Sequence, residues 1–174
     1  DYDSTDKATQ MFFAETQNKL LYAVTGQTAA EIIVNRADAS EPNMALTSWK
    51  GNVVRKQDIF TAKNYLLKDE IDTLNRLTVL FLDTAELRVK ERKDLNLHYW
   101  RETVDGLLNF QGKLVLQGAG SVSAKQMEAH VEAVYEQFNA KRKALALADA
   151  DEEDQQMILA DTDLLALQDS LQKR

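Results

Sequence analysis

The stretch that decides the fold is residues 69–92, DEIDTLNRLTVLFLDTAELRVKER. Core-compatible residues recur in it at steps of three and four, which is the spacing of one face of an α-helix. These residues are Ile71, Leu74, Thr78, Phe81 and Ala85, and the stripe is widened by Leu77, Leu80 and Leu82. The last turns carry Arg88, Lys90, Arg92 and Lys93, which complement the negative end of a helix dipole. We therefore expect a helix over these residues, and the width of its apolar stripe predicts a central position.

The sequence on either side of this stretch has the same helical character. The chain has one proline and six glycines in 174 residues, and it shows no sustained apolar–polar alternation. Capping-box spacing at Thr28/Glu31 and at Ser123/Gln126 marks two helix starts. The spacing predicts further helices over residues 4–24, 28–38, 58–66, 96–110 and 123–148, and one near 154–172. The expected fold class is all-α: a compact bundle of about five to seven helices with a C-terminal helical tail.

Residues 40–57 break this pattern. Pro42 disfavours helix at the residue before it, and Met44, Leu46 and Trp49 argue against disorder. We expect a long ordered loop that a buried Trp49 holds against the core.

The domain organisation follows from a run of acids near the C-terminus. The expected division is a helical domain over residues 1–148 and then an acidic linker with a final helix over residues 149–174. The acidic run comprises Asp149, Asp151, Glu152, Glu153 and Asp154. Because the first residue is Asp1 and not Met, we also expect the chain to be part of a longer protein.

Composition excludes several classes of function. The chain has no cysteine, which rules out thiolate chemistry and suits the cytoplasm. His98 and His130 are too far apart to form a compact ligand motif, and no nucleotide-binding loop is present, so we expect neither metal nor cofactor. The net charge of −7 opposes contact with nucleic acid. The longest apolar run, residues 79–82, is far shorter than a membrane helix, so no membrane partner is expected.

One segment is locally basic and carries interleaved aromatic residues. Residues 50–68 hold five basic side chains against the single acid Asp58. Cations beside aromatic rings suit a phosphate backbone or an unstacked base. The candidate contacts for nucleic acid or another anion are Lys50, Arg55, Lys56, Lys63, Asn64, Tyr65 and Arg76, with Asn75 beside them. The alternative is that the charges form a solvated face and the other polar groups anchor a loop, and this alternative is favoured.

Several ordered blocks of the sequence resemble one bacterial family. They are residues 1–25 (DYDSTDKATQMFFAETQNKLLYAVT), 28–39 (TAAEIIVNRADA), 42–51 (PNMALTSWKG), 62–66 (AKNYL) and 74–76 (LNR). In order and spacing they are similar to the C-terminal region of the virulence-associated RhuM family, over residues 1–140. Leu21 departs from the pattern, where an aromatic residue or histidine is expected.

The resemblance implies a helical C-terminal module of a DNA-binding protein, without assigned catalytic residues. DNA would be read by a separate N-terminal winged-helix-like part that this chain lacks. We therefore expect a non-catalytic interaction or oligomerisation module that forms a homodimer. The alternative is an effector or catalytic domain that acts on nucleic acid through the polar block around residues 50–76.

Overall fold

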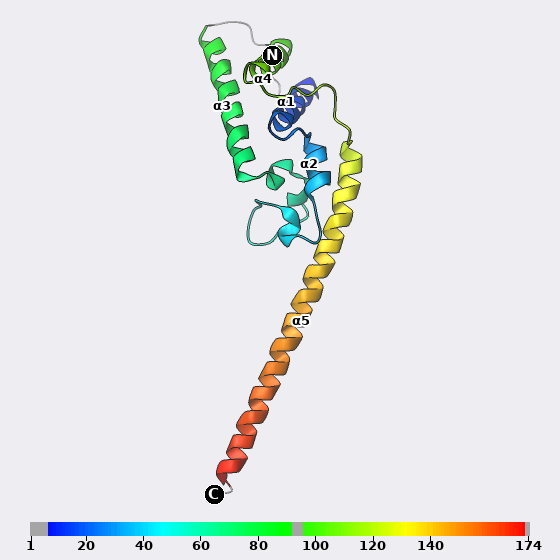
Figure 1. Ribbon diagram of the computed structural model, residues 1–174, viewed down its shortest axis with the longest axis vertical. Helices are drawn as coiled ribbons and strands as arrows, with labels where there is room; N and C mark the ends of the chain where they lie inside the picture. The colour runs from blue at the N-terminus through cyan, green and yellow to red at the C-terminus, as the bar shows by residue number, and fades with distance from the viewer. Residues whose placement is uncertain (1–6, 92–95, 173–174) are drawn as a thin grey trace. The chain divides into compact units, whose positions relative to one another are not determined.

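The computed structural model describes residues 7–91 and 96–172, and within these ranges it contains helices and no strand (Figure 1). The all-α class is therefore confirmed. The elements in chain order are α1 (Lys7–Thr25), α2 (Ala29–Arg36), the 3₁₀ turns η1 (Pro42–Ala45), η2 (Asp58–Phe60) and η3 (Ala62–Tyr65), α3 (Lys68–Lys90), α4 (Leu97–Phe110) and α5 (Ala124–Gln172). The chain falls into two compact units, Asp1–Tyr135 and Glu136–Arg174.

Helix α1 is the central element of the first unit. It packs against α2, α3 and α4 (Figure 1). Part of the core forms where α1, α3 and α4 meet, and its buried members are Ala23, Leu77, Val104 and Leu108. The α1 helix ends at Gly26, whose φ of +72° is the left-handed conformation that favours glycine after a helix.

Helix α3 has nearly the bounds predicted from sequence, but it is not central. Its only buried side chain is Leu77. Apolar side chains on its other side are 55–60% exposed, namely Val79, Leu82, Leu87 and Val89. The predicted central position is wrong because, within the described residues, α3 buries one side against α1 and α4 and leaves the opposite side to solvent. Arg92 and Lys93, predicted at its end, lie outside the described residues, as does Ser4 near the expected start of α1.

The loop between α2 and η2 is held more by three other buried apolar side chains than by the tryptophan. Met44, Leu46 and Val54 are almost fully buried, whereas Trp49 is only partly buried. Asn43, Met44 and Ala45 all have φ between +53° and +61°, so η1 is a left-handed turn that directs Met44 into the core. The helix predicted over residues 58–66 is replaced by the turns η2 and η3, which are separated at Thr61.

Helix α5 begins at the predicted cap and continues through the acidic run. The Ser123 hydroxyl accepts a hydrogen bond from the amide of Gln126, whose side chain accepts from Ser123 in return. Residues 149–154 are helical, so the expected break there is wrong. The run contains neither proline nor glycine, and repulsion between exposed acids costs too little to interrupt a helix. Within the helix predicted near 154–172, the side chains of Ile158 and of residues 160–172 lie outside the described set.

Candidate interaction surface and predicted polar block

Two members of the predicted polar block serve as loop anchors. The Asn64 side-chain amide donates to the carbonyl of Asp58 at 2.8 Å, and its backbone carbonyl accepts from the amide of Thr47 at 2.7 Å. Tyr65 is 1% exposed, and its hydroxyl donates to the carbonyl of Ile59 at 3.0 Å. Burial raises the pKa of the Tyr65 phenol, so this group stays protonated. Both residues therefore hold the loop and the 3₁₀ turns together.

The charged members of the block are exposed, and their partners in the described residues are other surface side chains. Lys50, Arg55 and Lys63 are exposed, and Lys56 forms an ion pair of 3.0 Å with Glu132 of α5. Arg76 lies on α3 and pairs with Asp72 one turn earlier, at 2.8 Å. None of these side chains lines either of the two cavities described below.

Arginine 36, which the sequence did not single out, joins three elements. Its guanidinium donates to both carboxylate oxygens of Glu70, at 2.6 and 2.7 Å, and to the carbonyl of Tyr65 at 2.8 Å. The Arg36 guanidinium holds the pKa of Glu70 below its usual range. This fork ties the end of α2 to η3 and to the first turn of α3. Two residues 34 positions apart give no local sequence signal, so spacing arguments could not find the pair.

A second carboxylate, Glu31, connects α2 to the loop before α5. One of its oxygens accepts from the Thr28 amide at 2.7 Å. The other accepts from the hydroxyl and the amide of Ser121, at 2.6 and 2.7 Å. These hydrogen bonds, first that from the Ser121 hydroxyl, lower the pKa of Glu31 to about 2. Gly120 permits the approach, because a Cβ at this position would lie 2.6 Å from Thr28 Cγ2.

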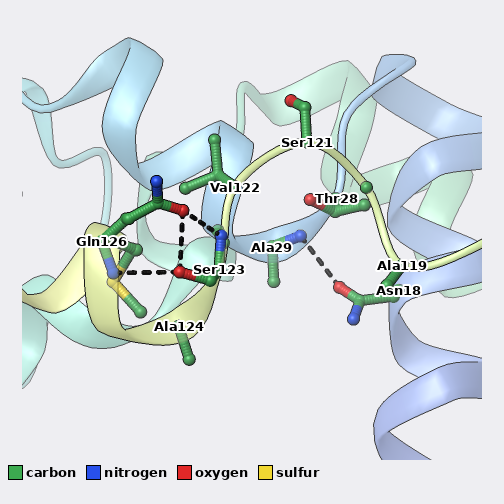
Figure 2. A pocket seen from close by; sticks show the side chains of 12 residues that line it. Asn18, Thr28, Ala29, Ala119, Ser121, Val122, Ser123, Ala124 and Gln126 are labelled. Carbon is green, nitrogen blue, oxygen red and sulfur yellow. Dashed lines mark hydrogen bonds between the residues drawn. The ribbon is translucent and has the colours of Figure 1, made fainter.

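The loop over residues 118–123 borders a cavity of about 480 Å³ (Figure 2). Figure 2 shows the starts of α2 and α5 on this cavity, with Asn18 bonded to the amide of Ala29 and Ser123 to Gln126. Its polar groups are engaged in capping helices, and its other lining side chains are mostly small and apolar. The arrangement stabilises helix starts and presents no nucleophile–base pair among the lining residues.

A cavity of about 660 Å³ lies on the α1 side of the same loop. Lys19 on its wall pairs with Asp105 of α4 at 2.7 Å, and Glu15 pairs with Arg101 at 2.9 Å. The Arg101 guanidinium lowers the pKa of Glu15. These pairs fasten α1 to α4, so the charges around the cavity are structural partners of one another.

The solvent side of α3, which we call the α3 outer face, combines exposed apolar side chains with charged ones. Its apolar members are Val79, Leu82, Leu87 and Val89, and its polar members are Asp72, Asn75, Arg76, Asp83, Glu86 and Lys90, all exposed. Successive residues of a helix are about 100° apart, so nine of these ten positions lie about 100° or more around the helix from the buried Leu77, and Leu87 lies about 80° from it. Val79 and Leu82 are three residues apart and form an adjacent apolar pair, whereas Leu87 and Val89 lie on either flank of the face among its charged side chains. An exposed apolar pair bordered by charges offers a surface that can contact another protein.

Within the described residues, no helix is long and apolar enough to cross a membrane. The described part of the chain also holds no cluster of three or more histidine and acidic side chains suited to a metal ion. The geometry thus defines an all-helical module whose polar groups mainly connect its own elements.

Comparison with protein families matches residues 1–146 to the virulence protein RhuM family, and the chain belongs to this family. The resemblance noted in the sequence is thereby confirmed. No curated protein and no solved structure matches the chain.

Proposed function

We propose that this chain is a non-catalytic self-association module of a RhuM-family protein. The observation that supports the proposal is the α3 outer face, where four large apolar side chains are 55–60% exposed on one helix. Burying such side chains contributes about 25 cal/mol per Å² of apolar surface removed from water. A second copy of the chain offers an identical apolar surface, and most soluble oligomers are built from identical chains.

The positions of the polar block favour this role over the catalytic alternative. Asn64 and Tyr65 are engaged in holding the loop, and Lys56 is paired with Glu132. A catalytic base or nucleophile needs a reachable atom near a substrate pocket. The engaged side chains of the block do not meet this requirement.

We further propose that DNA is read by another part of the full-length protein, in the cytoplasm, and that this module joins two such readers. DNA-binding proteins commonly dimerise so that two modules reach two half-sites. The net charge of −7 supports assigning the DNA contact elsewhere, because affinity for DNA depends largely on neutralising phosphates.

Sedimentation equilibrium over a concentration series tests the proposal. We expect a monomer of 19.7 kDa to convert to a dimer as concentration rises. A single 19.7 kDa species up to millimolar concentration would refute self-association. Hydrolysis of DNA or RNA by the purified chain, lost on Lys63→Ala replacement, would instead support the catalytic alternative.

A further inference from the structure

The charges on the α3 outer face alternate in a way that specifies how two copies can meet. Going along the helix, the order is Asp72, Arg76, then Asp83 and Glu86, then Lys90. Asp72 and Lys90 lie equally far from the level of residue 81, each about 14 Å from it at 1.5 Å per residue. A half-turn about an axis at this level therefore places an acid opposite a base at both ends.

We propose that a second copy of this chain packs its α3 antiparallel against the first, about a two-fold axis at the level of residue 81. This inference rests on the proposed function and names its partner and its geometry. Asp72 then lies opposite the partner's Lys90, and Arg76 lies opposite the partner's Asp83 and the partner's Glu86. Each of these contacts occurs twice in a symmetric dimer.

The apolar residues agree with the same arrangement. Val79 and Leu82 lie on either side of the axis, so that Val79 of one copy faces Leu82 of the partner subunit. These two side chains are 55% and 57% exposed in the single chain, and they would form the dry centre of the contact. The charges on either side would form its rim, which matches the usual anatomy of an interface.

A parallel pairing of the same two helices is disfavoured by charge. It would place each residue opposite its own copy, so that Asp83 and Glu86 would face identical acids. Like charges at an interface suppress that orientation, whereas opposite charges fix direction and register. The charge pattern thus selects the antiparallel pair, while the apolar centre supplies most of the affinity.

Charge reversal and charge exchange in the whole chain test the register. Arg76→Glu alone or Glu86→Arg alone should raise the dimer dissociation constant about tenfold or more, because each places like charges together at two symmetric positions. The double variant restores opposite charges between positions 76 and 86 but leaves an acid at position 76 opposite the partner's Asp83, so it should bind more tightly than either single variant and less tightly than the wild type. The matched controls Lys50→Glu and Glu128→Arg alter exposed charges away from α3 and should have little effect. Circular dichroism of each variant checks that α3 still folds.

Disulfide trapping tests whether the two α3 helices pack antiparallel, without relying on charge. Because the chain contains no cysteine, only the introduced cysteines can form disulfides. An affinity-tagged Asp72→Cys chain is mixed with an untagged Lys90→Cys chain and oxidised mildly. We expect disulfides between the two different chains, in excess over disulfides between two Asp72→Cys chains.

The outcomes separate this inference from the proposed function. A dimer with no response to the exchange and no mixed disulfide would overturn the α3 pairing and leave self-association intact through another surface. A disulfide between two Asp72→Cys chains would replace the antiparallel pair by a parallel one. If no dimer forms at any concentration, both proposals fail.

Discussion

At the scale of single residues, the most consequential group is the Glu31 carboxylate. Its capping-box contact with Thr28 follows from a spacing of three residues, and the structure confirms it. Its contact with Ser121 spans 90 positions and could not be predicted, because local spacing carries no information about which distant loop returns to the same place. The Arg36–Glu70 fork escaped prediction for the same reason.

Replacement of Glu31 by glutamine should make the free energy of unfolding depend less on pH in the acidic range. The folded pKa of about 2 lies below the ordinary value of 4.5, so the carboxylate stabilises the fold above pH 4.5 and loses this contribution as the pH falls toward 2. Glu31→Gln should lower the free energy of unfolding at pH 7 by about 1 kcal/mol, allowing for solvent screening. The reason is that the glutamine side-chain NH₂ replaces one accepting oxygen and meets the donors of Thr28 or Ser121. Urea unfolding at pH 7, 4 and 2.5 should show the difference from wild type shrinking. The control Glu128→Gln should show no such trend, and a pH-independent difference for Glu31→Gln would contradict the prediction.

Gly120 and Gly118 provide a matched pair for testing close packing. Both have positive φ, +85° and +92°, so alanine at either position is strained by about 1 kcal/mol. A Cβ at Gly120 would also meet Thr28 at 2.6 Å, whereas one at Gly118 would meet nothing within 4 Å. Gly120→Ala should therefore lower the free energy of unfolding by about 1–3 kcal/mol more than Gly118→Ala. Equal losses in urea titrations would show that the loop moves away from Thr28 freely.

At the scale of elements, periodicity predicted where helices lie better than which sides they bury. The bounds of α3 could be predicted to within about two residues because the apolar spacing within the helix is a local signal. The sequence could not reveal that one side of the stripe stays exposed, because the type of a hydrophobic residue does not show whether its side chain contacts the rest of the chain or solvent. The acidic run within α5 was misread for a related reason: charge density indicates solvation but does not by itself end a helix.

Two apolar positions on α3 should respond very differently to truncation. Leu77 is 8% exposed within the α1–α3–α4 core, and Val79 is 55% exposed two residues later. Leu77→Ala should lower the free energy of unfolding by about 2–5 kcal/mol, whereas Val79→Ala should change it by less than about 0.5 kcal/mol. The measurement is chemical denaturation at a concentration below the dimer dissociation constant that sedimentation gives. Similar losses of unfolding free energy at both positions would show that both sides of α3 are buried, as the sequence predicted.

At the scale of the whole molecule, charge opposes a role in binding nucleic acid. The chain carries 21 basic and 28 acidic residues, and the basic segment over residues 50–68 contributes Lys56 to an ion pair with Glu132. The fold class and the family could be predicted from composition and ordered blocks. The assignment of the basic residues could not, because exposure and pairing depend on how distant segments meet.

The isolated chain should bind duplex DNA weakly at physiological salt. If the basic segment did contact four phosphates, the log–log salt slope would be about −3.6, at roughly −0.9 per contact. Fluorescence anisotropy with a labelled duplex at several salt concentrations measures both affinity and slope. Tight binding that disappears on Arg55→Ala/Lys56→Ala replacement would show that this segment is the DNA contact after all.

The bridge from Glu31 to Ser121 has a consequence for the order of folding events. Most contacts in a helical protein are local and form early, but this one closes a loop of 90 residues and must await the assembly of the segments between. A contact formed after the transition state contributes to the barrier against unfolding and leaves the folding rate nearly unchanged. Removing it should therefore shorten the lifetime of the folded chain several-fold in stopped-flow unfolding, while refolding proceeds at the original speed. A single partly buried carboxylate would then slow the unfolding of the whole fold.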